Sequence, residues 1–227
     1  MEQVIRTLIV AALPLIFAIT LHEAAHGLVA KWLGDKTAYM MGRVTANPIK
    51  HIDPIGTIIV PIATYTMAHF LIGWAKPVPV TWQNLKHPRR DMAIVALAGP
   101  MANFLMAILW ALIMHVGLYI HAIGDHETWL QIGKFILNAG SYGILINMIL
   151  MIFNLLPIPP LDGSRVLSAI IPRKWSYYLD RIEPYGMFII LAFLFLGLYQ
   201  WVIYPLLIYM TNWIGTVFGL GPILPLH

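Results

Sequence analysis

Residues 7–30 read TLIVAALPLIFAITLHEAAHGLVA, and Glu23 is the only Asp, Glu, Lys or Arg among them. An α-helix needs about 20 predominantly apolar residues to cross about 30 Å of hydrocarbon, so the run is long enough for one crossing. It is too long for the apolar part of a secretory signal and has no small-residue cleavage site, so we expect it to remain in the mature protein. The run predicts a membrane-spanning helix that holds polar groups inside the bilayer.

The rest of the chain is similarly apolar. Hydrophobic residues make up 59% of its 227 positions and charged residues 11%, which is more apolar surface than one soluble core can bury. Further spans are expected at 92–120, 135–160 and 185–205, and residues 206–227 form either another span or an interfacial tail. We therefore expect an all-α polytopic membrane protein with about five transmembrane helices, within a range of four to six.

Basic residues are distributed unevenly around these segments. They follow the first span, precede the second and follow the third, whereas residues 119–130 contain none. Because positively charged loops stay in the cytosol, we predict an N-terminus outside and polar motifs near the cytosolic face. If residues 31–50 and 76–90 are both cytosolic, residues 54–73 cannot cross once and should be re-entrant or interfacial. Residues 39–45 are compatible with a short β strand or hairpin.

The pentad His22-Glu23-Ala24-Ala25-His26 indicates a metal site. Residues four apart lie on one face of a helix, so both imidazoles can reach one cation, and Glu23 lies beside that face. Two imidazoles, a carboxylate and an open position form the usual hydrolytic zinc site. The chain contains no cysteine, so the remaining ligand must be His, Asp or Glu. Glu23 is placed to act as the general acid and base.

Asp162 is the favoured third ligand. It follows Asn154-Leu-Leu-Pro-Ile-Pro-Pro-Leu at the predicted cytosolic end of the third span, at the depth of the pentad. Pro157, Pro159 and Pro160 cannot continue a helix, so we expect an extended segment there that could pair with an unwound substrate. A glutamate ligand is the alternative. The later glutamates are Glu127, predicted outside, and Glu183, beyond the third span, and neither reaches the site as directly.

Three motifs in order resemble those of the site-2 protease family of intramembrane zinc proteases. They are His22-Glu23-Ala-Ala-His26, Gly99-Pro100-Met-Ala-Asn103 and Asn154-Leu-Leu-Pro157-Ile-Pro159-Pro-Leu-Asp162-Gly163. The resemblance implies one zinc ion per chain bound by His22, His26 and Asp162, with Glu23 as base and Asn154 steadying the substrate or its oxyanion. Gly99, Pro100 and Asn103, with Pro157, Pro159 and Gly163, are expected to support the site structurally.

The same resemblance implies a substrate. It implies cleavage of a transmembrane protein near the cytosolic face, commonly after a first cut by another protease. The sequence leaves no room for the PDZ or CBS modules of many relatives, so a regulatory membrane partner becomes more plausible. We expect a single integral membrane peptidase domain over 1–227, with a three-helix catalytic core at about 4–165 and C-terminal helices at about 183–227.

Two other classes of function remain open. A metal or proton transporter also places His and Asp in the membrane, although it needs no non-ligand Glu23 and usually shows inverted repeats, which are missing. A structural membrane protein would tolerate Glu23→Gln. No nucleic-acid partner is expected, because the basic residues cluster in short loops beside apolar segments, and a prokaryotic cell membrane is the favoured location.

Overall fold

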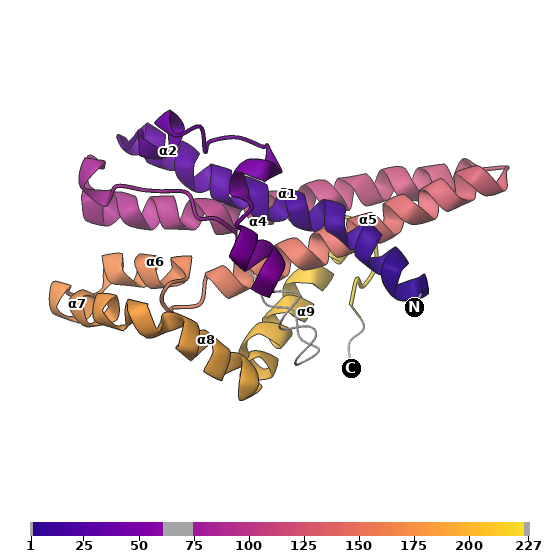
Figure 1. The fold of residues 1–227 in the computed structure, drawn as a ribbon. Helices are drawn as coiled ribbons and strands as arrows, with labels where there is room; N and C mark the ends of the chain where they lie inside the picture. Colours follow the sequence, from indigo (N-terminus) through magenta and orange to yellow (C-terminus); the bar gives the residue numbers. More distant parts are fainter. Residues whose placement is uncertain (1, 61–74, 225–227) are drawn as a thin grey trace.

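Three long helices form the frame of the molecule. The structure, a computed structural model, describes residues 2–60 and 75–224. Helices α1 (Glu2–Leu33), α4 (Pro88–Ile123) and α5 (Glu127–Asn154) run alongside one another (Figure 1). The described residues contain no β strand, so the predicted all-α membrane fold is confirmed. Among the described residues, three helices are long and apolar enough to cross a membrane, or four if a bent pair counts as one span, and four is the lower end of the predicted range.

Small residues let α4 and α5 approach closely. A side chain at Gly143 would collide with the Trp110 ring, and one at Gly117 would come within 3.0 Å of the Leu137 backbone nitrogen. Helices in a membrane gain little from the hydrophobic effect, so such close backbone packing supplies much of their association. Ile144 and Met148 of α5 are completely buried in the resulting core.

The chain leaves α5 through a series of turns. Residues 155–161 form turns and bends, with the amide of Leu161 bonded to the carbonyl of Ile158, before α6 (Asp162–Ile170) begins. The prediction of an extended segment here is therefore wrong, because prolines suit tight turns as well as strands. A side chain at Gly163 would collide with the Leu155 carbonyl, so glycine lets α6 return against the end of α5.

The C-terminal part is a broken helical path. It comprises α7 (Arg173–Ile182), η4 (Glu183–Tyr185), α8 (Gly186–Phe195) and α9 (Tyr199–Val217). The span predicted at 185–205 is not one straight helix, because the helical path bends by 79° between Arg173–Phe195 and Tyr199–Val217, as in a broken span or a re-entrant loop. Gly197 adopts φ +69° at the break, a left-handed conformation that glycine accommodates readily. Helix α9 packs on α5.

The segment between α1 and α4 holds short helices. They are α2 (Thr37–Met40), η1 (Pro48–His51), η2 (Pro54–Ile59) and η3 (Trp82–Asn84). The strand or hairpin considered for residues 39–45 is wrong, because α2 and a turn at Gly42, with φ +65°, occupy that stretch. Most of the re-entrant segment predicted at 54–73 lies outside the described residues.

Asp35 ties the region before α4 to the end of α1. Its Oδ1 accepts hydrogen bonds from the amide and hydroxyl of Thr37 and from Asn84 Nδ2, and its Oδ2 accepts one from the Thr81 amide at 2.8 Å. Burial raises the pKa of the Asp35 carboxyl, but the bonds from Thr37, Thr81 and Asn84 outweigh it, so the pKa lies below its usual value. Ionised Asp35 therefore fixes residues 81–84 against α1.

This lowered pKa predicts acid sensitivity. A carboxylate with a depressed folded-state pKa stabilises the fold above its unfolded pKa, near 3.9, and loses that contribution as pH falls through the folded value. We expect the melting temperature of the detergent-solubilised protein to fall more steeply below about pH 4 in the wild type than in Asp35→Asn. Parallel melting curves for the two proteins between pH 6 and 3 would contradict this role of Asp35.

Candidate metal centre

Each imidazole of the pentad is oriented by a hydrogen bond at Nδ1. His26 Nδ1 lies 2.7 Å from the carbonyl oxygen of Val95, and His22 Nδ1 lies 2.6 Å from Asn103 Oδ1; both partners are on α4. A carbonyl oxygen only accepts, so both Nδ1 atoms carry the proton in the neutral rings. The lone pairs of both Nε2 atoms are therefore free for another partner, the arrangement usual for metal-binding histidines.

Those lone pairs meet the carboxylate of Asp162. Its Oδ2 lies 3.2 Å from His22 Nε2 and 3.3 Å from His26 Nε2, and the two Nε2 atoms lie 3.1 Å apart. The two histidines are buried, and Asp162 Oδ2 is buried without a hydrogen-bond donor. With both Nδ1 atoms protonated and both rings neutral, three acceptors face one another, and no two of them can form a hydrogen bond with each other. Such a contact is unfavourable unless a cation lies among the three atoms.

The three atoms fit zinc. Ligands bound at about 2.0–2.1 Å in a tetrahedral zinc site lie about 3.3–3.4 Å apart, close to the separations of His22, His26 and Asp162. Two imidazoles and one carboxylate are also a known catalytic zinc ligand set with one open position. Among the described residues, this is the one group of three or more His, Asp or Glu side chains arranged to hold a metal ion.

Gly99 makes room for the two imidazoles. A Cβ atom at this position would lie 2.5 Å from Cε1 and 2.6 Å from Nε2 of His22 and would also collide with His26 Nε2. Pro100 follows it inside α4 and removes one backbone donor from the helix. Gly99 therefore brings the α4 backbone directly against the candidate metal-binding atoms of His22 and His26.

Glu23 is held by a residue far away in the sequence. Its Oε2 accepts a hydrogen bond of 2.8 Å from the amide of Val78, in the irregular segment before η3. The prolines on either side, Pro77 and Pro79, have no amide hydrogen, so Val78 supplies the donor in this stretch. The Val78 side chain reaches α1 at Gly27, where a Cβ would lie 3.1 Å from it. This contact was not predicted from the sequence.

A profile of the family described as Peptidase family M50 matches residues 10–197. The chain belongs to peptidase family M50. This is the site-2 protease family, so the predicted resemblance is confirmed, and the chain is a zinc metalloprotease of the membrane.

Several curated relatives carry zinc metalloprotease names. YwhC of Bacillus subtilis is 36% identical over 193 residues, which cover 85% of this chain and 83% of YwhC. Rip2 of Mycolicibacterium smegmatis is 25% identical over 79% of this chain and 64% of Rip2. A protein of Methanocaldococcus jannaschii is 29% identical over 70% of this chain and 65% of its own length. No solved structure shows a significant match.

In this M50 peptidase a row of amides fixes the orientation of His22. Asn103 Nδ2 donates to the carbonyl of Ala18 at 3.2 Å and to Asn147 Oδ1 at 3.0 Å, which turns Asn103 Oδ1 toward His22. Asn147 Nδ2 in turn donates to the carbonyl of Gly143 at 2.8 Å. Both amides are completely buried. Asn103 thus binds a candidate ligand directly, and Asn147, which was not predicted, holds Asn103.

Asn103→Leu is expected to weaken zinc binding about 10-fold to 100-fold, the usual effect of losing the partner of a metal-binding histidine. The measurement is zinc affinity by competition with a fluorescent chelator. Asn212→Leu is the matched control, because Asn212 lies in α9 and bonds to Ile223 and Leu224. Equal affinities in the two variants would contradict the role of Asn103.

The remaining predicted residues lie around the end of α5. Asn154 is its last residue, and its Nδ2 donates to the Leu150 carbonyl at 2.9 Å, so one N–H of the amide is engaged within the helix. Pro157 and Pro159 lie in the turns that lead to Asp162, and a side chain at Gly186 of α8 would collide with the Pro159 carbonyl. His69, in the segment predicted to be re-entrant, lies outside the described residues.

Proposed function

We propose that this peptidase hydrolyses a peptide bond in or near a transmembrane segment of a membrane-protein substrate. The observation that carries the proposal is the convergence of His22, His26 and Asp162 beside Glu23. Both histidines and Glu23 lie on α1, which is long and apolar enough to cross a membrane, and Asp162 opens α6 just after α5, which is also long enough. The pentad lies about seven residues before the end of α1 at Leu33, roughly 10 Å at 1.5 Å per residue. Counted from that end of α1, a bond cleaved here lies roughly 10 Å inside the span.

The three ligand side chains would hold one zinc ion per chain, which when bound supplies Lewis acidity for peptide hydrolysis. Glu23 takes a proton from the attacking water and passes it to the leaving nitrogen as the carbon–nitrogen bond breaks. The bond from Val78 fixes one oxygen of Glu23 and leaves the other for this transfer. Asn154 retains one amide N–H that could steady the developing oxyanion.

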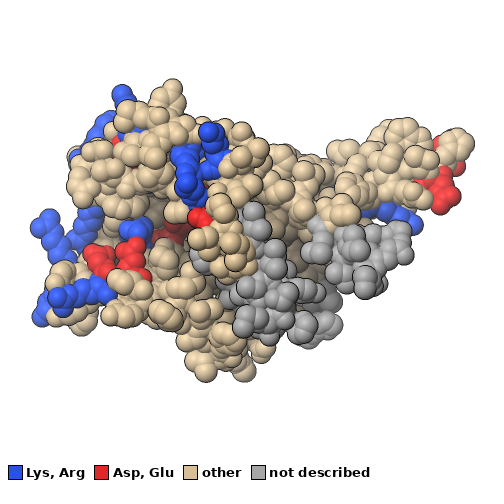
Figure 2. Space-filling model, viewed as in Figure 1, with Lys and Arg blue, Asp and Glu red and all other residues tan. Residues whose placement is uncertain are grey.

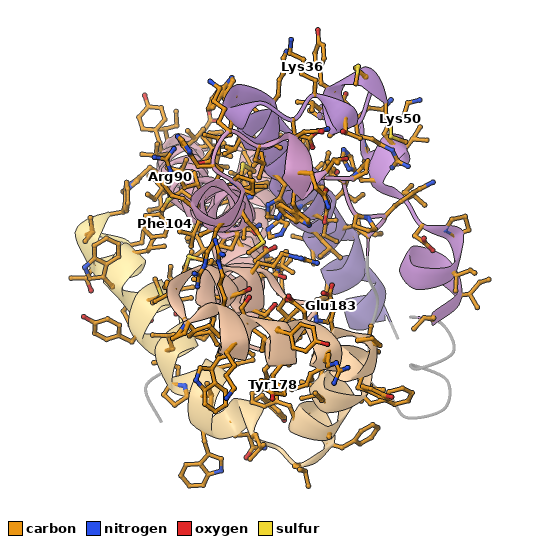
Figure 3. All side chains as sticks on the ribbon, turned by 90° about the vertical axis from the view of Figure 1, so that its left-hand side faces the viewer. Lys36, Lys50, Arg90, Phe104, Tyr178 and Glu183 are labelled. Carbon is orange, nitrogen blue, oxygen red and sulfur yellow. The ribbon has the colours of Figure 1, made fainter. Side chains whose placement is uncertain are left out.

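The proposed orientation places the site toward the cytosol. Lys and Arg side chains gather at the end of the molecule that carries α2, α6 and α7 (Figure 2). Figure 3 looks onto this end and shows Lys36, Lys50 and Arg90 there. The positive-inside rule assigns such an end to the cytosol. A substrate already cut by another protease, a regulatory membrane partner and a prokaryotic cell membrane belong to the same proposal.

The test compares membrane proteins from cells with and without this chain, with peptide termini mapped by mass spectrometry. We expect membrane stubs to accumulate in cells without the chain, and the new termini in wild-type cells to fall near the cytosolic ends of transmembrane segments. Identical fragments in both cell types would contradict the proposal. Zinc transport by the purified protein in vesicles without any cleavage would instead favour a transporter.

A further inference from the structure

Helix α7 has one face without a protein partner among the described residues. On its inner side the Ser176 hydroxyl lies 2.6 Å from the Ser168 hydroxyl of α6, and Leu179 and Asp180 line a small cavity that also includes Arg165. None of its ten residues is buried. The outer side leaves large side chains exposed, with 62% of the Trp175 surface and 55% of the Tyr177 surface accessible.

The exposed face combines aromatic and basic residues. Positions 173, 177 and 181 are spaced four apart and form one stripe, with 174 and 178 beside it. The residues of this face are Arg173, Lys174, Tyr177, Tyr178 and Arg181, and the exposed Trp175 ring lies at its edge, 6.1 Å from the Tyr178 ring. The guanidinium of Arg181 lies 4.9 Å from the centre of the Tyr177 ring, so the two kinds of side chain occupy the same surface. The acidic residue of the helix, Asp180, lies on the cavity side.

Helix α7 also lies level with an end of the membrane-spanning frame. Arg89, in the first turn of α4, donates to the carbonyls of Ser168 and Ile171, immediately before α7 begins. Figure 1 shows α6 and α7 at the same end of the molecule as α2. In Figure 3 Glu183, just after α7, lies near the centre, and Tyr178 lies farther out. The exposed face of α7 is therefore at the depth where a bilayer presents its headgroups.

We propose that α7 is an interfacial helix that binds anionic phospholipid headgroups of the leaflet beside the metal centre. An amphipathic helix with basic residues and aromatic rings lies in the headgroup region, where the rings enter the acyl boundary. Each Lys or Arg close to an anionic surface strengthens the attraction by roughly fivefold, so three of them give about a hundredfold preference over a neutral surface at low salt. Because α6 begins at Asp162 and is bonded to α7, lipid binding fixes the helix that carries a metal-binding residue.

The test uses the absence of cysteine in the chain. A single cysteine placed by Tyr178→Cys is labelled with an environment-sensitive fluorophore, and the full-length protein is reconstituted in phosphatidylcholine vesicles with increasing phosphatidylglycerol. We expect the emission to shift to shorter wavelength as phosphatidylglycerol increases, and the shift to reverse in high salt, which screens exposed charges. The α7 triple variant, which combines Arg173→Gln, Lys174→Gln and Arg181→Gln, should abolish this shift in emission.

The matched control removes the same amount of charge elsewhere. Lys36, Lys50 and Lys86 are exposed and lie outside α7, so their replacement by glutamine should leave the shift intact. The proposal would be overturned if the emission wavelength did not change with phosphatidylglycerol, or if the shift persisted in the α7 triple variant. It would also be overturned if both triple variants lost the shift equally. A short-wavelength emission that is independent of lipid and salt would show a protein partner on this face and would also overturn it. These readouts are independent of proteolysis, so the proposed peptidase activity and the lipid site can fail separately.

Discussion

Glu23→Gln is expected to abolish peptide cleavage while zinc remains bound. Glu23 lies beside the two imidazoles on α1 but is not part of the three-residue cluster, so its replacement leaves His22, His26 and Asp162 intact. Glutamine keeps an oxygen that can accept the hydrogen bond from Val78, so the local structure should persist. It cannot take a proton from water, and losing a general base typically lowers the rate about 100-fold to 10,000-fold.

The measurement is turnover of a transmembrane substrate by the purified protein, together with its zinc content. Glu127→Gln is a suitable control, because Glu127 is exposed at the start of α5 and bonds to Gln131. Wild-type turnover in Glu23→Gln would exclude Glu23 as the base. Loss of zinc along with activity would show that Glu23 supports the metal rather than the proton transfer.

Gly99→Ala is expected to remove zinc and activity together. The added methyl group would collide with both imidazoles at the atoms that face Asp162. Both rings are also held at Nδ1 by Asn103 and Val95, so they cannot turn aside without breaking buried hydrogen bonds. We expect a loss of zinc affinity of more than about 100-fold, above the 10-fold to 100-fold expected for losing one partner of a ligand.

Gly140→Ala is the control for crowding in a membrane helix. Its methyl group would push against the flexible side chain of Met114, away from the metal centre, so zinc should remain bound. Zinc affinity by chelator competition and melting temperature are measured on both variants. Wild-type zinc affinity in Gly99→Ala would contradict the geometry of the site. Equal losses of zinc affinity in the two variants would show that crowding between helices, rather than contact with the imidazoles, causes the loss.

The spacing of residues along the chain predicted the three candidate metal ligands of the site. Two histidines four residues apart share a helix face wherever the helix lies, and the charge pattern placed Asp162 at the same end of the membrane. The structure brings these three side chains together. The broad fold followed in the same way from the length of the apolar segments, which correspond to α1, α4 and α5.

Tertiary contacts account for what the sequence did not predict. The amide of Val78 reaches Glu23 across 55 positions, and Asn147 reaches His22 only through Asn103. Hydrophobic periodicity does not identify such pairs. An asparagine within an apolar helix, such as Asn147, is the one sequence feature that indicates a buried polar contact between helices. Apolar composition alone does not predict the break at Gly197, because the surrounding residues are apolar enough for a continuous span. The left-handed conformation of this one glycine changes the direction of the chain.

We propose that His22, His26 and Asp162 hold the zinc of this membrane peptidase. Zinc K-edge X-ray absorption of the purified protein tests it most directly, because the spectrum reports the ligand atoms. We expect one zinc per chain, with a shell of nitrogen and oxygen at about 2.0–2.1 Å that includes two imidazoles. A protein without zinc, or a spectrum that Asp162→Ala and His22→Ala leave unchanged, would contradict it.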